Sequence, residues 1–234
     1  MTTKEFSDSF DTLLNSYQNS PNFGETEISS NITIDEYEKS VFLTRAQEEI
    51  VVSFYSGKNA NYESFESSEE LRRYLDSLVK TKVYQYEEQL EGLNGLSDNS
   101  IFFKLPKDML FISLEEVVYD TDDCYNNTYS NVYPITHDEW ANVKDNPFRG
   151  PTKYKAIRLD YGDNIVEIIS KFNFKNYIIK YLSKPNPIIL VDLPNGLSIQ
   201  EENKQTECSI NSILHNTILQ RAVELAIASK SRQG

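Results

Sequence analysis

The residues of this sequence best suited to chemistry are three acidic side chains, Asp120, Asp122 and Asp123, followed at once by Cys124. Several oxygen ligands close together are what Ca²⁺ prefers. The run lacks, however, the spacing and the closing glutamate of an EF-hand loop. We therefore expect a solvated turn between two strands here, and we keep a metal-dependent enzyme as the alternative.

The two histidines, His137 and His215, do not indicate a metal or catalytic site. Neither has a second histidine or a cysteine at metal-ligand spacing, so capping or surface roles are expected. Glu115 and Glu116 are adjacent in a predicted strand, where neighbours point to opposite faces. They are therefore not expected to form an acid–base pair.

Sequence motifs for the common catalytic sites are absent. The chain has no GxSxG nucleophile motif, no GxxxxGK[ST] phosphate loop and no GxGxxG dinucleotide loop. We expect no catalytic residue, no metal and no cofactor, and hence no enzyme.

The composition and charge of the chain argue against nucleic acids and membranes as partners. The 234 residues carry a formal net charge of -13, which repels nucleic acid and anionic membranes. The two cysteines, far apart, are expected to be free thiols in a reducing compartment. The N-terminal MTTKEFSDSF shows no leader pattern, and no apolar run reaches the ~18 residues of a membrane span. We expect no membrane contact.

One basic and aromatic stretch leaves nucleic-acid binding open as an alternative. It combines Lys171, Lys175, Lys180 and Lys184 with Phe172, Phe174, Tyr177 and Tyr181. Aromatic side chains beside basic ones can stack single-stranded bases. Against this acidic background, an ordinary strand or a face between subunits is the preferred interpretation.

Helical patterns occupy both ends of the chain. Phe6, Phe10 and Leu14 recur at helical intervals over residues 3–18. Capping boxes at Asp35/Glu38 and at Thr44/Gln47 predict a short helix at 35–42 and a longer one at 45–56, which ends at Gly57. Further helices are expected after Ser67 and over residues 210–229.

The middle of the chain has strand patterns. IFFKLP, LFISLEEVVY and residues 176–182 are rich in aromatic and β-branched residues. KYKAIRLDYGDNIVEIIS predicts a hairpin that turns at residues 161–164. Thr136 with Glu139 predicts a short helix near 137–144, and Ile188 to Val191 predicts a short buried strand.

These patterns predict an α+β protein, in which a helical bundle is interrupted by a mostly antiparallel β-rich insertion. We expect a helical part at 1–82, the insertion at 83–200, and a C-terminal helix at 201–234 that packs back on the helical part. Pro185 and Pro187 bracket Asn186 and hold the backbone extended. They predict a rigid crossover from the insertion to the bundle.

Several blocks in the right order carry a family resemblance. They are IDEYEKSVFLTRAQEEIVVSFY, FFKLPKDMLFI, NPFRGP, KYKAIRLDYGDNIVEIIS, YLSKPNPIILVDL and ECSINSILHNTILQRAVELAIASK. Together they resemble virion structural proteins of crAss-like and other short-tailed bacteriophages, and more narrowly their tail-adaptor or ring proteins, over about residues 34–230.

The resemblance implies a ring of about twelve copies beneath the portal, which connects it to the tail and lines the DNA exit channel. The implied partners are the portal, neighbouring copies, the next tail ring or nozzle protein, and passing DNA that is not bound specifically. The protein would be made in the cytoplasm of the bacterial host and would act in the virion, at the tail or portal vertex.

The chain stops soon after its last predicted helix, at SKSRQG, whereas related adaptors often continue further. A second ring, a stopper or a cargo protein therefore stays an alternative. The sequence leaves open whether the helix that carries Phe6 and Phe10 is ordered before assembly or only against a neighbour. The full set of expected interface residues is Phe6, Phe10, Tyr177, Tyr181, Arg221, Lys230 and Arg232.

Overall fold

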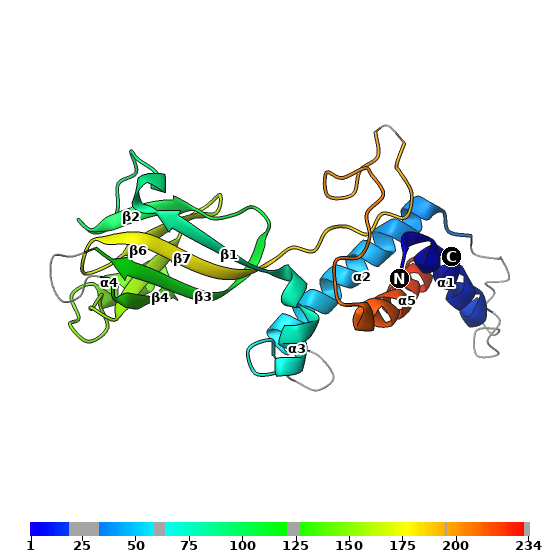
Figure 1. The fold of residues 1–234 in the computed structure, drawn as a ribbon, viewed down its shortest axis with the longest axis horizontal. Coiled ribbons are helices and arrows are strands. Elements are labelled where there is room, and N and C mark those ends of the chain that lie inside the picture. The colour runs from blue at the N-terminus through cyan, green and yellow to red at the C-terminus, as the bar shows by residue number, and fades with distance from the viewer. Residues whose placement is uncertain (19–32, 59–63, 121–126, 195, 232–234) are drawn as a thin grey trace. The chain divides into compact units, whose positions relative to one another are not determined.

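The computed structural model of the chain describes residues 1–18, 33–58, 64–120, 127–194 and 196–231 (Figure 1). The protein is a mixed α/β protein of two compact units. We call them the helical unit (residues 1–78 and 184–234) and the sheet unit (residues 79–183). The division differs from the expected boundaries at 83 and 200, because the first strand starts at Val79 and residues after 183 lie against a helix of the helical unit.

Three long helices dominate the helical unit: α1 (Thr3–Gln18), α2 (Glu36–Ser56) and α5 (His215–Ser231). The short elements α3 (Glu69–Tyr74), η2 (Asp76–Leu78) and η4 (Ser212–Leu214) complete it. Helix α5 packs against both α1 and α2. The apolar side chains buried in these three helices are Phe6, Phe10, Leu14, Leu43, Ala46, Ile50, Val51, Ile218, Leu219, Ala222, Val223 and Ala226.

Helix α2 begins and ends where the sequence predicts. The Asp35 carboxylate accepts from the Glu38 N–H at 2.7 Å, and Gly57 ends the helix in the left-handed region at φ 71°. The predicted break near residue 43 is wrong, because one helix runs through it. Thr44 and Gln47 do not cap a helix; their side chains bond to a distant segment.

The sheet unit contains seven strands: β1 (Val79–Gln85), β2 (Ser100–Lys104), β3 (Met109–Tyr119), β4 (Tyr129–Ile135), β5 (Lys155–Asp160), β6 (Ile165–Ile169) and β7 (Phe174–Ser183). Their order in the sheet is β1-β7-β3-β4-β5-β6-β2. All neighbours pair antiparallel except β4 and β5, which are parallel. Strand β4 escapes the sequence patterns because it contains Pro134, a residue that usually argues against a strand.

The predicted hairpin and the short helix are both confirmed. β5 and β6 are joined by a tight turn in which Asp163 and Asn164 have φ of 59° and 60°. Helix α4 (His137–Val143) starts with the expected capping box of Thr136 and Glu139. It covers one face of the sheet, where Trp140 and Val143 pack on buried residues of β5 and β6.

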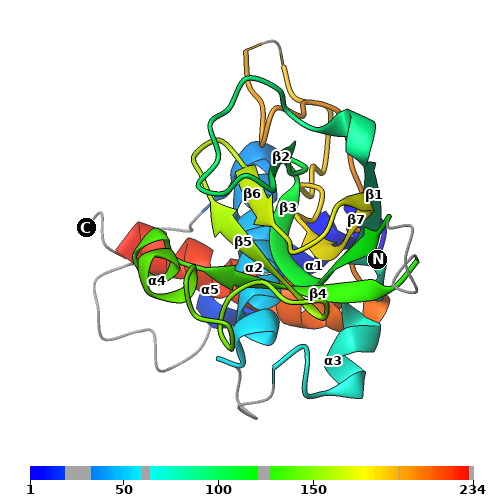
Figure 2. The same cartoon turned by 90° about the vertical axis from the view of Figure 1, so that its left-hand side faces the viewer.

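The sheet curls around its own core, with the strands wrapping an interior in the view of Figure 2. Tyr84 of β1 stacks with Tyr177 of β7 and also contacts Phe103 of β2, so the two edge strands approach each other. The 3-10 turn η3 (Tyr86–Glu88) follows β1. Just after it, the Leu90 N–H donates to the Phe102 carbonyl at 2.8 Å along the outer side of β2.

Candidate functional site

Of the acidic run, only Asp120 lies in the described part of the chain. Asp120 directly follows β3 and donates its N–H to the Asn173 carbonyl at 3.0 Å, while Asp122, Asp123 and Cys124 lie outside the described residues. No group of three or more histidine, cysteine, aspartate or glutamate side chains is suitably placed for a metal in the described ranges. The free thiol of Cys208 contacts the Gln47 amide oxygen at 3.2 Å.

Both histidines have local structural roles. The Nε2 atom of His137 lies 3.1 Å from the Asp160 carbonyl, and its ring packs edge-on against Tyr161. His215 is buried beside Phe6, with Nε2 3.1 Å from the Ile210 carbonyl and Nδ1 2.7 Å from the Met1 amino group. Burial lowers the pKa of His215, and the nearby amino group adds to the effect.

A buried polar cluster crosses the inside of the sheet unit. A carboxylate oxygen of Glu115 on β3 lies 2.7 Å from a guanidinium nitrogen of Arg158 on β5, and the Tyr177 hydroxyl on β7 donates to Glu115. Burial raises the pKa of Glu115, and Arg158 and Tyr177 oppose that rise. Burial also raises the pKa of Tyr177 well above its usual value. The cluster joins three strands, and sequence patterns do not reveal it because its members are 62 residues apart at the widest.

Two expected interface residues, Tyr177 and Tyr181, belong to the core of the sheet unit. Tyr177 is fully buried, and Tyr181 is 5% exposed. Phe174 is buried in the same core. Three of the four rings in the basic and aromatic stretch are therefore buried within the subunit, which argues against a platform for stacking bases.

Phe6 and Phe10 are also core residues rather than exposed ones. Both are fully buried on the face of α1 that packs against α5. Helix α5 of the same chain covers them, so their burial needs no neighbouring copy.

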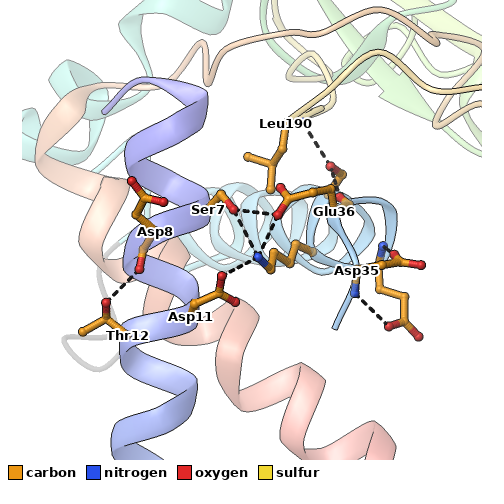
Figure 3. Close-up of polar contacts among 10 residues, drawn as sticks. Ser7, Asp8, Asp11, Thr12, Asp35, Glu36 and Leu190 are labelled. Atoms are coloured by element: carbon orange, nitrogen blue, oxygen red, sulfur yellow. Dashed lines mark hydrogen bonds and ion pairs between the residues drawn. The ribbon is translucent and has the colours of Figure 1, made fainter. Parts of the chain in front are cut away.

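A buried lysine on α2, Lys39, forms an ion pair and hydrogen bonds with side chains of α1. The Lys39 ammonium group donates to Asp11 at 2.7 Å, to Glu36 at 2.8 Å and to Ser7 at 3.1 Å, and Figure 3 shows these three acceptors grouped together. Burial lowers the pKa of Lys39, but the bonds to Asp11 and Glu36 outweigh burial and raise it overall. The lysine therefore stays charged and holds the two helices together.

The crossover that follows β7 lies against α2. Pro185 and Pro187 are both buried, and Asn186 between them is exposed. Residues 188–190 are buried, but they form only one isolated bridge, between Ile189 and Thr206, so the predicted strand is wrong.

Side chains of α2 take the place of a neighbouring strand. The Gln47 amide donates to the Asn186 carbonyl at 2.8 Å. The Thr44 hydroxyl accepts from the Ile188 N–H at 3.0 Å and lies 3.3 Å from the Ile188 carbonyl. The Ser40 hydroxyl accepts from the Leu190 N–H at 3.0 Å. We call these three side chains the α2 ladder.

Two of the three expected basic interface residues are held in ion pairs. Arg221 on α5 lies 2.9 Å from Glu49 and 3.2 Å from Glu224, and Lys230 lies 2.9 Å from Glu38. Arg232 lies outside the described residues. Glu49, Arg221 and Glu224 also line a hollow of about 440 Å³ between α2 and α5.

Comparison with known proteins identifies the family of the chain. The sequence model of a family described as phage tail ring protein 3/4 matches residues 1–234. Ring protein 3 of Bacteroides phage crAss001 is 48% identical over 236 residues, which cover 99% of this chain and 97% of that protein. Ring protein 4/5 of the same phage is 31% identical over 245 residues, 98% of this chain and 93% of that protein. The chain therefore belongs to the phage tail ring protein 3/4 family of crAss-like phages, as the resemblance predicted.

Proposed function

We propose that the chain is a subunit of a closed tail ring that connects the portal to the tail and surrounds the path of the DNA. The family match over the whole sequence carries this proposal. The family and the names of both relatives point to a virion structural protein with a non-enzymatic role. A closed ring of about twelve copies would repeat one head-to-tail contact between neighbours.

In this proposal, the helical unit is a bundle into which the sheet unit is inserted. The two segments of the helical unit, residues 1–78 and 184–234, flank the whole sheet unit in the sequence. The α2 ladder and the Pro185–Pro187 crossover then hold the returning chain on the bundle.

The negative charge of the chain is consistent with a channel through which DNA passes without binding. A net charge of -13 per copy, repeated around a ring, repels phosphate and would keep the genome mobile.

No helix in the described ranges is long and apolar enough to cross a bilayer.

The names of the relatives favour a second candidate for the position of the ring. Both names carry numbers beyond the first ring of a series, Ring protein 3 and Ring protein 4/5. The ring would then stack on another tail ring and not on the portal itself. Both positions share the same subunit architecture but differ in the partner on the head side.

Native mass spectrometry of the full chain tests both positions. The chain would be measured alone, with its cognate portal, and with the other ring proteins of the same phage. A ring of about twelve copies formed on the portal supports the adaptor position. A ring formed only on another ring protein supports stacking. A monomer under all three conditions would remove the ring proposal.

A further inference from the structure

Two surfaces of the sheet unit differ in charge and share exposed apolar side chains. We call residues 144–155, KDNPFRGPTKYK, the basic turn; it has four basic residues and one acidic one, a net charge of +3. We call residues 86–98, YEEQLEGLNGLSD, the acidic loop; it has four acidic residues and no basic one, a net charge of -4. The two segments lie on opposite sides of the sheet unit, the loop before β2 and the turn after α4 (Figures 1 and 2).

The basic turn displays an aromatic side chain to solvent. Phe148 is 92% exposed, and Tyr154 of the same turn is 60% exposed. Arg149, next to Phe148, is exposed and has no ion-pair partner among the described residues. Phenylalanine, tyrosine and arginine are among the residue types enriched in protein interfaces.

The turn holds Phe148 outward by its own hydrogen bonds. The Asn146 side-chain oxygen accepts from the N–H groups of Phe148 at 2.9 Å and of Arg149 at 3.2 Å. The Gly150 N–H donates to the Asn146 carbonyl at 2.8 Å, and a Cβ at Gly150 would lie only 2.9 Å from that oxygen. Just before the turn, Trp140 and Val143 anchor α4 in the core. A turn whose backbone is ordered before binding loses less entropy when a partner covers it.

The acidic loop has the complementary chemistry. Leu93 is 46% exposed and Leu96 is 49% exposed, and both lie between acidic residues. The Leu96 N–H donates to the buried Glu167 carboxylate at 2.6 Å, so this loop too is fixed to the sheet. Within the described ranges, Glu91 and Asp98 have no salt-bridge partner.

We propose that the basic turn of one copy docks on the acidic loop of the next copy, with Phe148 packed between Leu93 and Leu96 and Arg149 facing the acidic residues. The occupant is a second copy, because the two surfaces are complementary in charge and face away from each other on one unit. A contact between two different surfaces repeats head to tail, as ring closure requires. The inference rests on the proposed ring and specifies which surfaces form it.

Association of the full chain tests the inference, using sedimentation velocity and native mass spectrometry. Phe148→Ala and Arg149→Glu should each weaken self-association by about tenfold or more, as at interface centres. Ile213→Ala is the matched control, since Ile213 is 63% exposed but lies in the helical unit; it should change association less than about twofold. Because Phe148 contributes almost no buried surface to the subunit, the melting temperature of its variant should stay that of the parent.

Charge exchange and cross-linking identify the partner surface. Arg149→Glu combined with Glu91→Lys restores opposite charges across the contact and should recover much of the association. In a chain with Cys124→Ser and Cys208→Ser, Phe148→Cys mixed with Leu93→Cys should form a covalent dimer on oxidation. Phe148→Cys mixed with Ile213→Cys should not.

The outcomes separate this inference from the ring itself. If the parent chain assembles and Phe148→Ala assembles equally well with no specific cross-link, the two surfaces are wrong and the ring stands. Failure of charge exchange together with cross-linking to Ile213→Cys would also overturn the inference. A parent chain that stays monomeric with every tail partner removes both proposals.

Discussion

Thr44 lies in the middle of helix α2, but its side chain forms hydrogen bonds with a residue 144 positions further along the chain. Its hydroxyl group accepts from the Ile188 N–H and also lies within reach of the Ile188 carbonyl, in a buried environment. Backbone groups buried without a partner cost free energy, so this hydroxyl replaces what a neighbouring strand would supply.

Thr44→Val should therefore destabilise the protein although the two side chains have nearly the same shape. The valine leaves the Ile188 N–H buried without its acceptor, which should lower the free energy of unfolding by about 1–3 kcal/mol. Urea denaturation followed by circular dichroism measures the change.

Thr12→Val provides the comparison for that loss. The Thr12 hydroxyl also bonds a backbone carbonyl, that of Asp8 at 2.8 Å, but on the exposed side of α1. Its replacement should change stability by less than about 0.5 kcal/mol. Equal effects of the two substitutions would show that the α2 ladder contributes nothing specific.

Among the elements, β3, β5 and β7 are joined by the buried cluster of Glu115, Arg158 and Tyr177. Arg158→Met removes the cation and leaves Glu115 buried without its charge partner. We expect a loss of about 3–5 kcal/mol in unfolding free energy at neutral pH. Adding Glu115→Met should recover part of it, because the second change removes the uncompensated carboxylate.

The same variant should become more stable, relative to the parent protein, in mild acid. Burial already raises the pKa of Glu115 above its ordinary 4.5, and loss of Arg158 removes an opposing influence. Native Arg158→Met then binds a proton that the unfolded chain does not bind, so its stability rises as pH falls towards 4.5. Chemical denaturation between about pH 7 and 5 measures this, and a pH-independent gap from the parent would contradict it.

The crossover element depends on its two prolines. Pro185→Ala combined with Pro187→Ala frees the unfolded chain and should lower stability by about 1–2 kcal/mol in total. It should also speed hydrogen exchange at the Ile188 and Leu190 amides, which the α2 ladder protects. If melting temperature, amide exchange and ring assembly all stay unchanged, the prolines do not stiffen the crossover.

Elements with local signals were predictable from sequence, and elements with distant partners were not. Asp35, Thr136 and the turn at residues 161–164 act within a few positions, and the structure confirms each. Thr44 and Gln47 have the same spacing as a capping box, but their partners lie on the crossover. A local pattern cannot separate these two uses of the same residue types.

Buried and exposed aromatic residues were equally hard to separate. Tyr177 has an apolar ring and a polar tip, which suit an interface as well as a core. Its burial follows from the curling of the sheet and from Glu115 beneath it, neither of which the sequence reveals. Phe148, which is the most exposed aromatic residue among the described exposed large hydrophobics, sits in a stretch that composition alone does not distinguish.

At the scale of the whole molecule, the chain enters the sheet unit through β1 and leaves it through β7, and these two strands are neighbours in the sheet. Val79 of β1 pairs with Leu182 of β7, so the first and last strands of the unit begin and end side by side. The helical unit contains α1, α2 and α5, and its described residues include no strand of the sheet.

Replacing residues 79–183 with a short glycine–serine linker should therefore leave a folded helical unit. We expect cooperative thermal unfolding and a helical circular dichroism spectrum, while ring formation should be lost. Deleting residues 1–18 is the matched change, because it removes Phe6, Phe10 and Leu14 from the helical core and should abolish cooperative unfolding. A shortened chain without cooperative unfolding would mean that the helical unit needs the sheet unit to fold.

The α2 ladder imposes a matching of lengths between two kinds of backbone. Four residues of helix, from Ser40 to Thr44, advance by about 6 Å. Two residues of extended chain, from Leu190 to Ile188, advance by about 6.6 Å, so the two spacings coincide. One residue inserted between Ser40 and Thr44 would turn the rest of the helix by about 100° and carry the later contacts off the crossover. Gene variants with insertions should thus be tolerated in surface loops but eliminated between residues 40 and 47.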